Sequence, residues 1–269
     1  MGAVTRAPLS HPAALWRRLA AEFLGSAFLA AIVIGSGIAA QRLSPSDTGL
    51  ELLENSAATA AGLFAIILMF GPVSGAHFNP VVSLADAALG GVSWRDAAAY
   101  LPAQVAGCVT GAVGANLMFS EEAVSISVKP RASGAHALSE VIATAGLILV
   151  IFALARSGRL ASAPAAVGAY IGAAYWFTSS TSFANPAIDV GRMFSNTFAG
   201  IEPSSVPVFL AAQIGGGIAG VAIIRILYPA LTPGEAAGVV VPHDAADDQL
   251  ALAELAQADG GRPAPAGLD

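Results

Sequence analysis

Two stretches of this chain decide how it folds: SGAHFNPVV at residues 74–82 and SFANPAIDVGRMF at residues 182–194. Each contains an Asn-Pro pair, Asn79-Pro80 or Asn185-Pro186, inside a long run without charged residues. Proline suits the first turn of a helix, where the backbone N–H that it lacks would have no partner, and asparagine is a favoured N-cap. The sequence therefore predicts that a short helix begins at each pair.

The composition is that of a membrane protein. Hydrophobic residues make up 55% of the 269 residues and charged residues only 11%, whereas soluble domains carry about 25% charged residues. Four of the uncharged runs have the length of one transmembrane helix, roughly 20 residues. The other two contain the Asn-Pro pairs and are too long for one span and too short for two, which indicates six spans and two half-spans. The uncharged runs are 23–41, 55–85, 97–120, 141–155, 160–188 and 203–224.

The two halves of the chain repeat the same features in the same order. Each opens with a span that carries one acidic residue, Glu22 or Glu140, and continues through an Asn-Pro run. Each closes with a helix of small residues that contains Ala-Gln, starting at Ala103 or Ala212. Because each half has an odd number of spans, the second half is inverted relative to the first. The half-helices then enter from opposite sides, and their N-termini meet near the middle of the membrane.

Such an arrangement has an electrostatic consequence. Irregular backbone persists at membrane depth only inside protein or around a water-filled cavity. Each helix N-terminus carries a fractional positive charge of roughly +0.5 e, so two of them facing one pore disfavour cations and protons. We expect the capped amides of Asn79 and Asn185 to remain free to donate hydrogen bonds to a passing molecule.

From about Trp16 to Tyr228 the chain resembles the aquaporin, or major intrinsic protein, family. The resemblance rests on the two Asn-Pro stretches, the paired glutamates and the paired Ala-Gln helices. It implies an all-α membrane protein with six transmembrane helices and two re-entrant half-helices in an inverted three-plus-three repeat. It also implies a pore in every subunit, a homotetramer, and pore motifs formed by Asn79, Pro80, Val81, Asn185, Pro186 and Ala187.

Four polar residues are predicted to support the re-entrant loops. The resemblance implies that Glu22 and Glu140 accept hydrogen bonds from the loops of their own halves; a proton carrier is the alternative reading of an intramembrane acid. His77 is interpreted as a loop-positioning group rather than a metal ligand. Asp189 is expected to brace the start of the second half-helix rather than contact solute, because a carboxylate is stabilised there.

The resemblance, carried over by counting from the motifs, implies a constriction formed by Thr59, Ala173, Ser182 and Ile188. Water-selective members of the family carry an arginine where this chain has Ile188, and Val81 replaces the usual alanine of the first motif. We therefore expect a wide, uncharged and half-apolar constriction, which disfavours ions because nothing replaces their water. The candidate solutes are water, glycerol-like polyols, urea and neutral metalloid hydroxides.

The stretch 182–194 is most similar to bacterial aquaporins associated with arsenic resistance, which implies arsenite or methylated arsenicals. Arg192 is interpreted as an anchor between the helix and the loop that follows it; the alternative is that its side chain reaches toward the outer vestibule of the pore.

Domain boundaries and orientation follow from charge and composition. Residues 1–14 form an N-terminal segment, 15–231 the channel, with repeats at 15–118 and 137–231, and 232–269 an acidic tail with the Pro, Gly and Ala content typical of a solvated extension. The basic residues concentrate on the side of the termini, so both termini are predicted to be cytoplasmic in the cell (inner) membrane.

Small residues in the closing helices leave two readings open. Gly107-x-x-x-Gly111 and Gly216-x-x-x-Gly220 indicate close helix packing, within the bundle or between subunits. The lone Cys108 excludes an internal disulfide and is expected to be a packed thiol, with reactivity toward thiol reagents as the alternative.

No cofactor, metal or nucleic-acid partner is expected, and no set of residues suggests an enzyme. The predicted partners are the lipid bilayer, small neutral solutes and further copies of the chain. The alternatives to a neutral-solute channel are a mainly water-conducting aquaporin and an ion-coupled inverted-repeat transporter, which usually carries ionisable groups in its spans.

Overall fold

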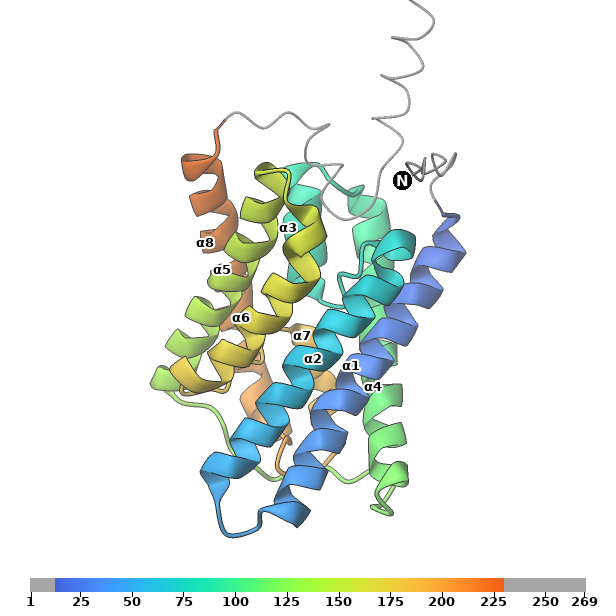
Figure 1. Cartoon of the computed structure of the whole chain (residues 1–269), viewed down its shortest axis with the longest axis vertical. Coiled ribbons are helices and arrows are strands. Elements are labelled where there is room, and N and C mark those ends of the chain that lie inside the picture. Colours follow the sequence, from blue (N-terminus) through green and yellow to red (C-terminus); the bar gives the residue numbers. More distant parts are fainter. Residues whose placement is uncertain (1–12, 230–269) are drawn as a thin grey trace, which may run out of the picture.

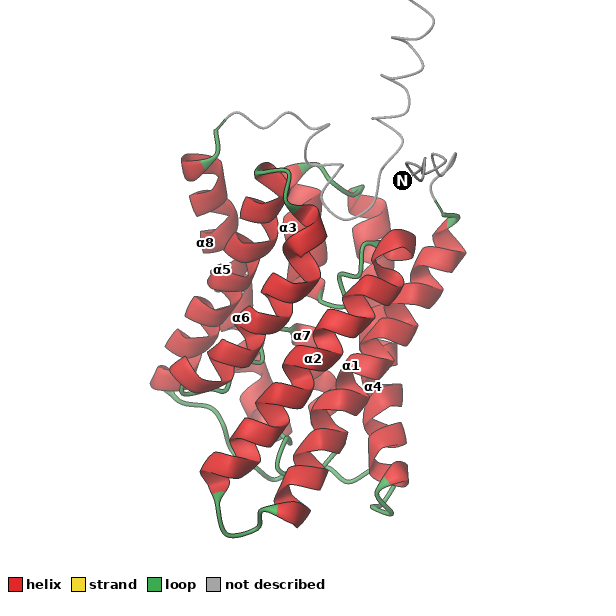
Figure 2. Cartoon of the chain, in the orientation of Figure 1, coloured by secondary structure: helices red, strands yellow, loops and turns green. Residues whose placement is uncertain are grey.

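The computed structural model describes residues 13–229 and shows an all-helical bundle. Longer helices stand around two short ones, α3 and α7, which begin inside the bundle and do not cross it (Figures 1 and 2). This confirms the predicted all-α architecture. The helices are α1 (Leu15–Leu43), α2 (Thr48–Ser74), α3 (Pro80–Leu89), α4 (Trp94–Met118), α5 (Gly134–Arg156), α6 (Ala163–Phe177), α7 (Pro186–Arg192) and α8 (Val206–Leu227), with 3₁₀ turns η1 (Leu160–Ser162) and η2 (Pro203–Ser205).

Among the described helices, four are long and apolar enough to cross a membrane by themselves: α1, α2, α5, and α8 together with η2. The other two long helices are less obvious spans for different reasons. Helix α6 has 15 residues, fewer than the roughly 20 that span a bilayer upright. Helix α4 has 25 residues but carries Gln104, Thr110 and Asn116 among many alanines and glycines. Large apolar side chains such as Phe28 and Ile218 are exposed on the bundle, as a multi-pass membrane protein requires.

The glycines of the closing helices lie in contacts within the chain. Gly107 and Gly111 of α4 face the backbone carbonyls of Phe23 and Ala27 in α1, and a Cβ at either glycine would overlap them. In the second half, a Cβ at Gly220 of α8 would lie 2.8 Å from the Cβ of Ile148 in α5. The structure therefore uses these glycines for packing inside the bundle, the first of the two readings that the sequence left open.

The short helices begin at the Asn-Pro pairs, as the sequence predicts. Asn79 caps α3 by accepting a hydrogen bond from the Val81 N–H at 3.0 Å. Asn185 caps α7 by accepting from the Ala187 and Ile188 N–H groups at 3.0 and 3.3 Å. We call the face where α1 begins, at the top of Figure 1, the N-terminal face; α7 runs from the middle of the bundle toward the opposite face.

Candidate functional site

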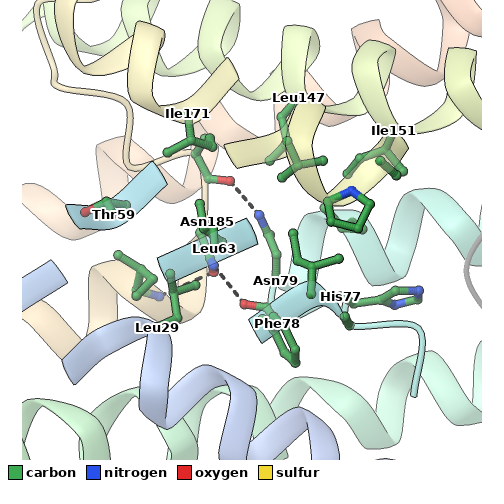
Figure 3. A pocket seen from close by; sticks show the side chains of 18 of the residues that line it. Leu29, Thr59, Leu63, His77, Phe78, Asn79, Leu147, Ile151, Ile171 and Asn185 are labelled. Atoms are coloured by element: carbon green, nitrogen blue, oxygen red, sulfur yellow. Dashed lines mark hydrogen bonds between the residues drawn. The ribbon is translucent and has the colours of Figure 1, made fainter. Parts of the chain in front are cut away.

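A cavity of about 540 Å³ lies at the centre of the bundle, and both half-helices begin at it (Figure 3). Its wall is mostly apolar, with Leu29, Leu63, Leu147, Ile151 and Ile171 projecting from four different helices. Polar groups reach it mainly from the Asn-Pro stretches, including the side chains of both asparagines. An apolar tube with a few polar groups at its middle suits a solute that is small, polar and uncharged.

The two asparagine side chains join the halves of the protein. The amide nitrogen of Asn79 donates to the carbonyl oxygen of Ala184 at 2.7 Å, and that of Asn185 donates to the carbonyl of Phe78 at 2.8 Å (Figure 3). Each amide has two N–H groups. One of them is therefore committed to the opposite loop, and only the second is left for a passing molecule, a restriction that the sequence did not reveal.

The two loops before the asparagines have matching backbone strain. Ala76 and Phe78 have positive φ angles of 52° and 49°, and Ser182 and Ala184 have 49° and 47°. These residues stand three and one positions before each asparagine. Left-handed conformations cost energy in residues other than glycine and persist only where the surroundings enforce them.

Glu22 holds the first of these loops. Its carboxylate accepts hydrogen bonds from the backbone N–H groups of His77 at 3.0 Å and Phe78 at 2.7 Å. It also accepts from the side chains of Ser74 and Gln104. The side chain is fully buried, so these donors take the place of water around the carboxylate.

Glu140 occupies the equivalent place in the second half. It accepts from the N–H groups of Phe183 at 2.9 Å and Ala184 at 2.7 Å, and from the amide of Gln213 at 2.7 Å. Both glutamates thus contact the residues directly before the asparagine of their own half. This geometry suits loop bracing, since the hydrogen bonds to the two carboxylates within residues 13–229 come from the re-entrant loops, the flanking Ser74 and the Ala-Gln helices.

His77 belongs to a small polar cluster at the cavity wall. Its Nδ1 lies 3.0 Å from the hydroxyl of Ser83, and its Nε2 lies 3.4 Å from the carboxylate of Asp86. Asp86 is 2% exposed, and the sequence analysis did not predict a role for it. Its position three residues after Ser83, on the same face of α3, could have indicated that the two side chains lie together. Within the described part of the chain, no group of three or more His, Cys, Asp and Glu residues could hold a metal ion.

Three of the four predicted constriction residues line the cavity: Thr59, Ser182 and Ile188. Ala173 does not. It lies on the exposed side of α6, where Ile171 and Tyr175 turn toward the cavity instead. The two lining residues are four apart and so share one face of the helix, whereas residue 173 points away from both. Counting back from Asn185 through the loop therefore missed the inward-facing positions by two residues.

The remaining predicted residues are buried near the cavity, except Pro186, which is partly exposed. Val81 packs against Gly217 of α8 and is absent from the wall of the central cavity, as are both prolines and Ala187. Asp189 is fully buried in the first turn of α7 and is also outside the cavity wall. Cys108 is buried between helices, and its thiol points to the carbonyl of Ser26 at 3.6 Å.

One charged side chain that was not assigned to the constriction lies at the cavity: Arg192, at the end of α7. It is 2% exposed, its Nε–H donates to the carbonyl of Ala199, and its guanidinium carbon lies 3.4 Å from the centroid of the Phe183 ring. The expectation of an uncharged wall at this end of the pore therefore needs correction. Arg192 both anchors the loop after α7 and faces the cavity.

Comparison with known proteins agrees with this geometry. The family model of the major intrinsic protein matches residues 9–197. The chain is 48% identical to aquaglyceroporin AqpS of Rhizobium meliloti (strain 1021) over 80% of this chain and 92% of the relative. It is 34% identical to the glycerol uptake facilitator protein of Pseudomonas aeruginosa, over 82% and 94% of the two chains.

Among solved structures, the fold is similar to that of the aquaglyceroporin from Plasmodium falciparum. The TM-score is 0.63 at 20% sequence identity, and the match covers 80% of this chain and 98% of the other. This likeness supports the six-helix, two-half-helix architecture. Together with the Asn-Pro half-helices around one cavity, the matches show that the chain belongs to the major intrinsic protein family.

Proposed function

We propose that this protein is a wide passive channel that passes water, glycerol-like polyols and neutral metalloid hydroxides such as arsenite, and that excludes ions and protons. The observation that carries the proposal is Ile188. It lines the cavity in the first turn of α7, at the position where water-selective members of the family carry an arginine. The relatives named as an aquaglyceroporin and a glycerol uptake facilitator support the same solute class.

The physical argument concerns width and hydration. An isoleucine in place of an arginine removes a long side chain from the pore, so a solute larger than water keeps room and part of its hydration. The neighbouring wall of Leu63 and Ile171 offers no replacement for the water around an ion. A neutral polyol loses less on entering, because its hydroxyl groups can bond to the few polar groups near Asn79 and Asn185.

The matched test compares native protein with Ile188→Arg and Ile188→Val in proteoliposomes, by stopped-flow light scattering under water, glycerol and arsenite gradients. The arginine should reduce glycerol and arsenite flux sharply while water flux persists, and the valine should leave all three close to native. Unchanged glycerol and arsenite flux in Ile188→Arg contradicts the constriction. Native protein that passes water alone supports the water-channel alternative.

An ion-coupled transporter is the second alternative, and the structure bears on it. The two intramembrane glutamates each accept hydrogen bonds from backbone N–H groups, which tie each carboxylate to a fixed loop. A group that carries protons across a membrane has to change protonation and exposure. Glycerol flux that is insensitive to proton and sodium gradients is expected; strict dependence on either gradient would favour the transporter.

For the cellular setting we propose a homotetramer in the cell (inner) membrane with both termini in the cytoplasm. The start of α1 and the end of α8 lie on the same face of the bundle (Figure 1), and Arg17, Arg95, Arg156 and Arg225 all stand near helix ends at that face. Positive residues favour the cytoplasmic side. The predicted acidic tail, 232–269, lies outside the described residues. Light scattering of the purified protein and protease accessibility of epitope-tagged termini test the assembly and the orientation.

A further inference from the structure

Arg192 stands on the same face of α7 as Ile188, four residues further along the helix. Four residues correspond to about 6 Å along a helix axis, so Arg192 lies that much nearer the mouth on the opposite face. Helical side chains lean toward the N-terminus of their helix. A long side chain at this position therefore reaches back toward the level of Ile188, and Arg192 does line the cavity.

The guanidinium of Arg192 is held in place but has no ion-pair partner among residues 13–229; the buried carboxylates of Asp189 and Glu140 act on its charge from beyond ion-pair distance. Phe183 and the carbonyl of Ala199 fix it, through a ring contact and one bond to Nε–H. Within residues 13–229, neither terminal nitrogen has a hydrogen-bond acceptor, and none of the ion pairs includes this arginine. These nitrogens are thus free to point charge and N–H donors at whatever enters the mouth.

A second arginine lies at the same ring. The guanidinium carbon of Arg131, in the loop between α4 and α5, is 5.1 Å from the centroid of Phe183. Its Nε–H donates to the carbonyl of Gly200 at 2.8 Å. Burial, and next the charge of Arg192, lower the pKa of Arg131 to about 9. Two guanidinium groups therefore share one aromatic ring at this end of the cavity.

Lys129 adds a third positive charge from the same loop. Its ammonium donates to the carbonyl of Phe198 at 3.0 Å. Burial first, and then the charges of Arg131 and Arg192, lower its pKa from the ordinary value. Three acids oppose these cations: Glu51 at the start of α2 acts on Lys129, Glu140 acts on Arg131 and Arg192, and Asp189 acts on Arg192.

Two hydroxyl groups line the same cavity as Arg192. The hydroxyl groups of Thr59 and Tyr175 lie 3.3 Å apart, and both residues line the cavity with Arg192. A hydroxyl both donates and accepts, whereas a guanidinium only donates. The mouth thus offers N–H and O–H donors together with hydroxyl acceptors, which matches a solute carrying several hydroxyl groups.

We propose that Arg192 is the selectivity residue of this mouth: its charge bars cations, and its free N–H groups bind an oxygen of the neutral solute, the two tasks that Ile188 does not perform. Arg131 is a positioning residue that shares the Phe183 ring. The proposal deepens the channel function proposed above and rests on it. The apolar wall near Ile188 disfavours every ion, and Arg192 adds a charge barrier against cations one helical turn further outward.

The test uses Arg192→Met, a neutral side chain that retains packing on Phe183, together with Arg192→Lys. The matched control is Arg42→Gln, an exposed arginine on the same face that pairs with Glu121. Sodium and proton leak into proteoliposomes are measured with fluorescent indicators, beside glycerol flux. Under intermediate screening, a positive charge about 5 Å from a passing cation lowers the rate of cation entry at least tenfold. The methionine variant, which lacks this charge, should therefore leak cations about tenfold faster. Lysine should restore exclusion, and the control should match the native protein.

Each outcome decides the matter. A methionine variant that conducts glycerol and stays as tight to sodium and protons as the native protein overturns the assignment of Arg192. Should that variant fail to fold, Arg192→Gln, which retains a donor for the Ala199 carbonyl, is held to the same expectation. Native protein that shows no glycerol flux refutes the channel proposal itself, and is thereby distinct from failure of the Arg192 assignment.

Discussion

Replacing Glu140 by glutamine tests whether one carboxylate holds the second re-entrant loop. The carboxylate accepts three hydrogen bonds, two from the backbone N–H groups of Phe183 and Ala184 and one from Gln213. A glutamine keeps one acceptor oxygen and presents an NH₂ group where the other oxygen was. At least one backbone N–H in the loop then faces a donor, and the other bonds lose their charge assistance.

The magnitude follows from those bonds. A hydrogen bond to a charged group contributes about 1.5–3 kcal/mol, and a buried donor left without an acceptor costs about 1–3 kcal/mol. We expect Glu140→Gln to destabilise the protein by about 2–3 kcal/mol, since one bond is lost and two are weakened. For a chain of this size 1 kcal/mol shifts the melting temperature by about 2–4 °C. The expected shift is therefore about 4–12 °C, with reduced glycerol flux because the loop loses the carboxylate that accepts hydrogen bonds from Phe183 and Ala184.

The lone cysteine provides the assay. Cys108 is fully buried, so a dye that fluoresces on reacting with thiols reports unfolding in detergent. Glu22→Gln should shift the transition at least as far, because that carboxylate accepts four bonds. The control is Glu122→Gln, an exposed acid in the loop between α4 and α5. A Glu140→Gln protein that melts with the native protein and conducts normally would falsify the bracing role.

Three further changes test other features of the structure. Gly111→Ala should lower the melting temperature by several degrees, because its Cβ overlaps the Ala27 carbonyl, whereas Gly114→Ala, with no atom within 4 Å of the new Cβ, should not lower it. Ile171→Trp should block glycerol flux and Ala173→Trp should not, since only the first lines the cavity; equal block by both would restore the position counted from sequence. Cys108 in the folded protein should resist polar thiol reagents, as mass spectrometry of treated proteoliposomes would show, and rapid labelling would mean that α1 and α4 open readily.

The sequence predicts the features that depend on local chemistry. An asparagine cap followed by proline can begin a helix whatever surrounds it, so the sequence predicts the starts of α3 and α7 at Asn79 and Asn185. The inverted repeat could also be predicted, because it follows from the order of the motifs and from the odd number of spans in each half. The packing glycines were recognised by spacing, but only the structure assigns Gly107 and Gly111 to a contact inside the chain.

Features that depend on the path of the backbone could not be predicted. Ala173 was assigned by counting through a loop whose residues adopt left-handed angles, and such a loop has no fixed rise per residue. The carbonyl partners of Asn79 and Asn185 lie in the other half, and no local pattern indicates them. Arg192 was visible one turn beyond Ile188, but whether a long side chain turns toward a pore or toward a loop depends on Phe183 and Ala199, which pack only in the folded protein.

The two hydrogen bonds that the asparagine side chains form between the loops also constrain the order of folding during synthesis. Asn79 and its acceptor carbonyl are separated by 105 residues, and Phe78 and the amide that bonds to its carbonyl by 107. At about 5–20 residues per second, the ribosome needs roughly 5–20 s to make the second partner after the first. During that interval the first loop has an amide and a carbonyl that no part of the nascent chain can yet satisfy, and leaving them in lipid would cost several kcal/mol each. The first loop is therefore expected to stay in contact with water or the insertion machinery until the chain has grown past residue 185, and the pore closes around its axis as one of the last events of folding.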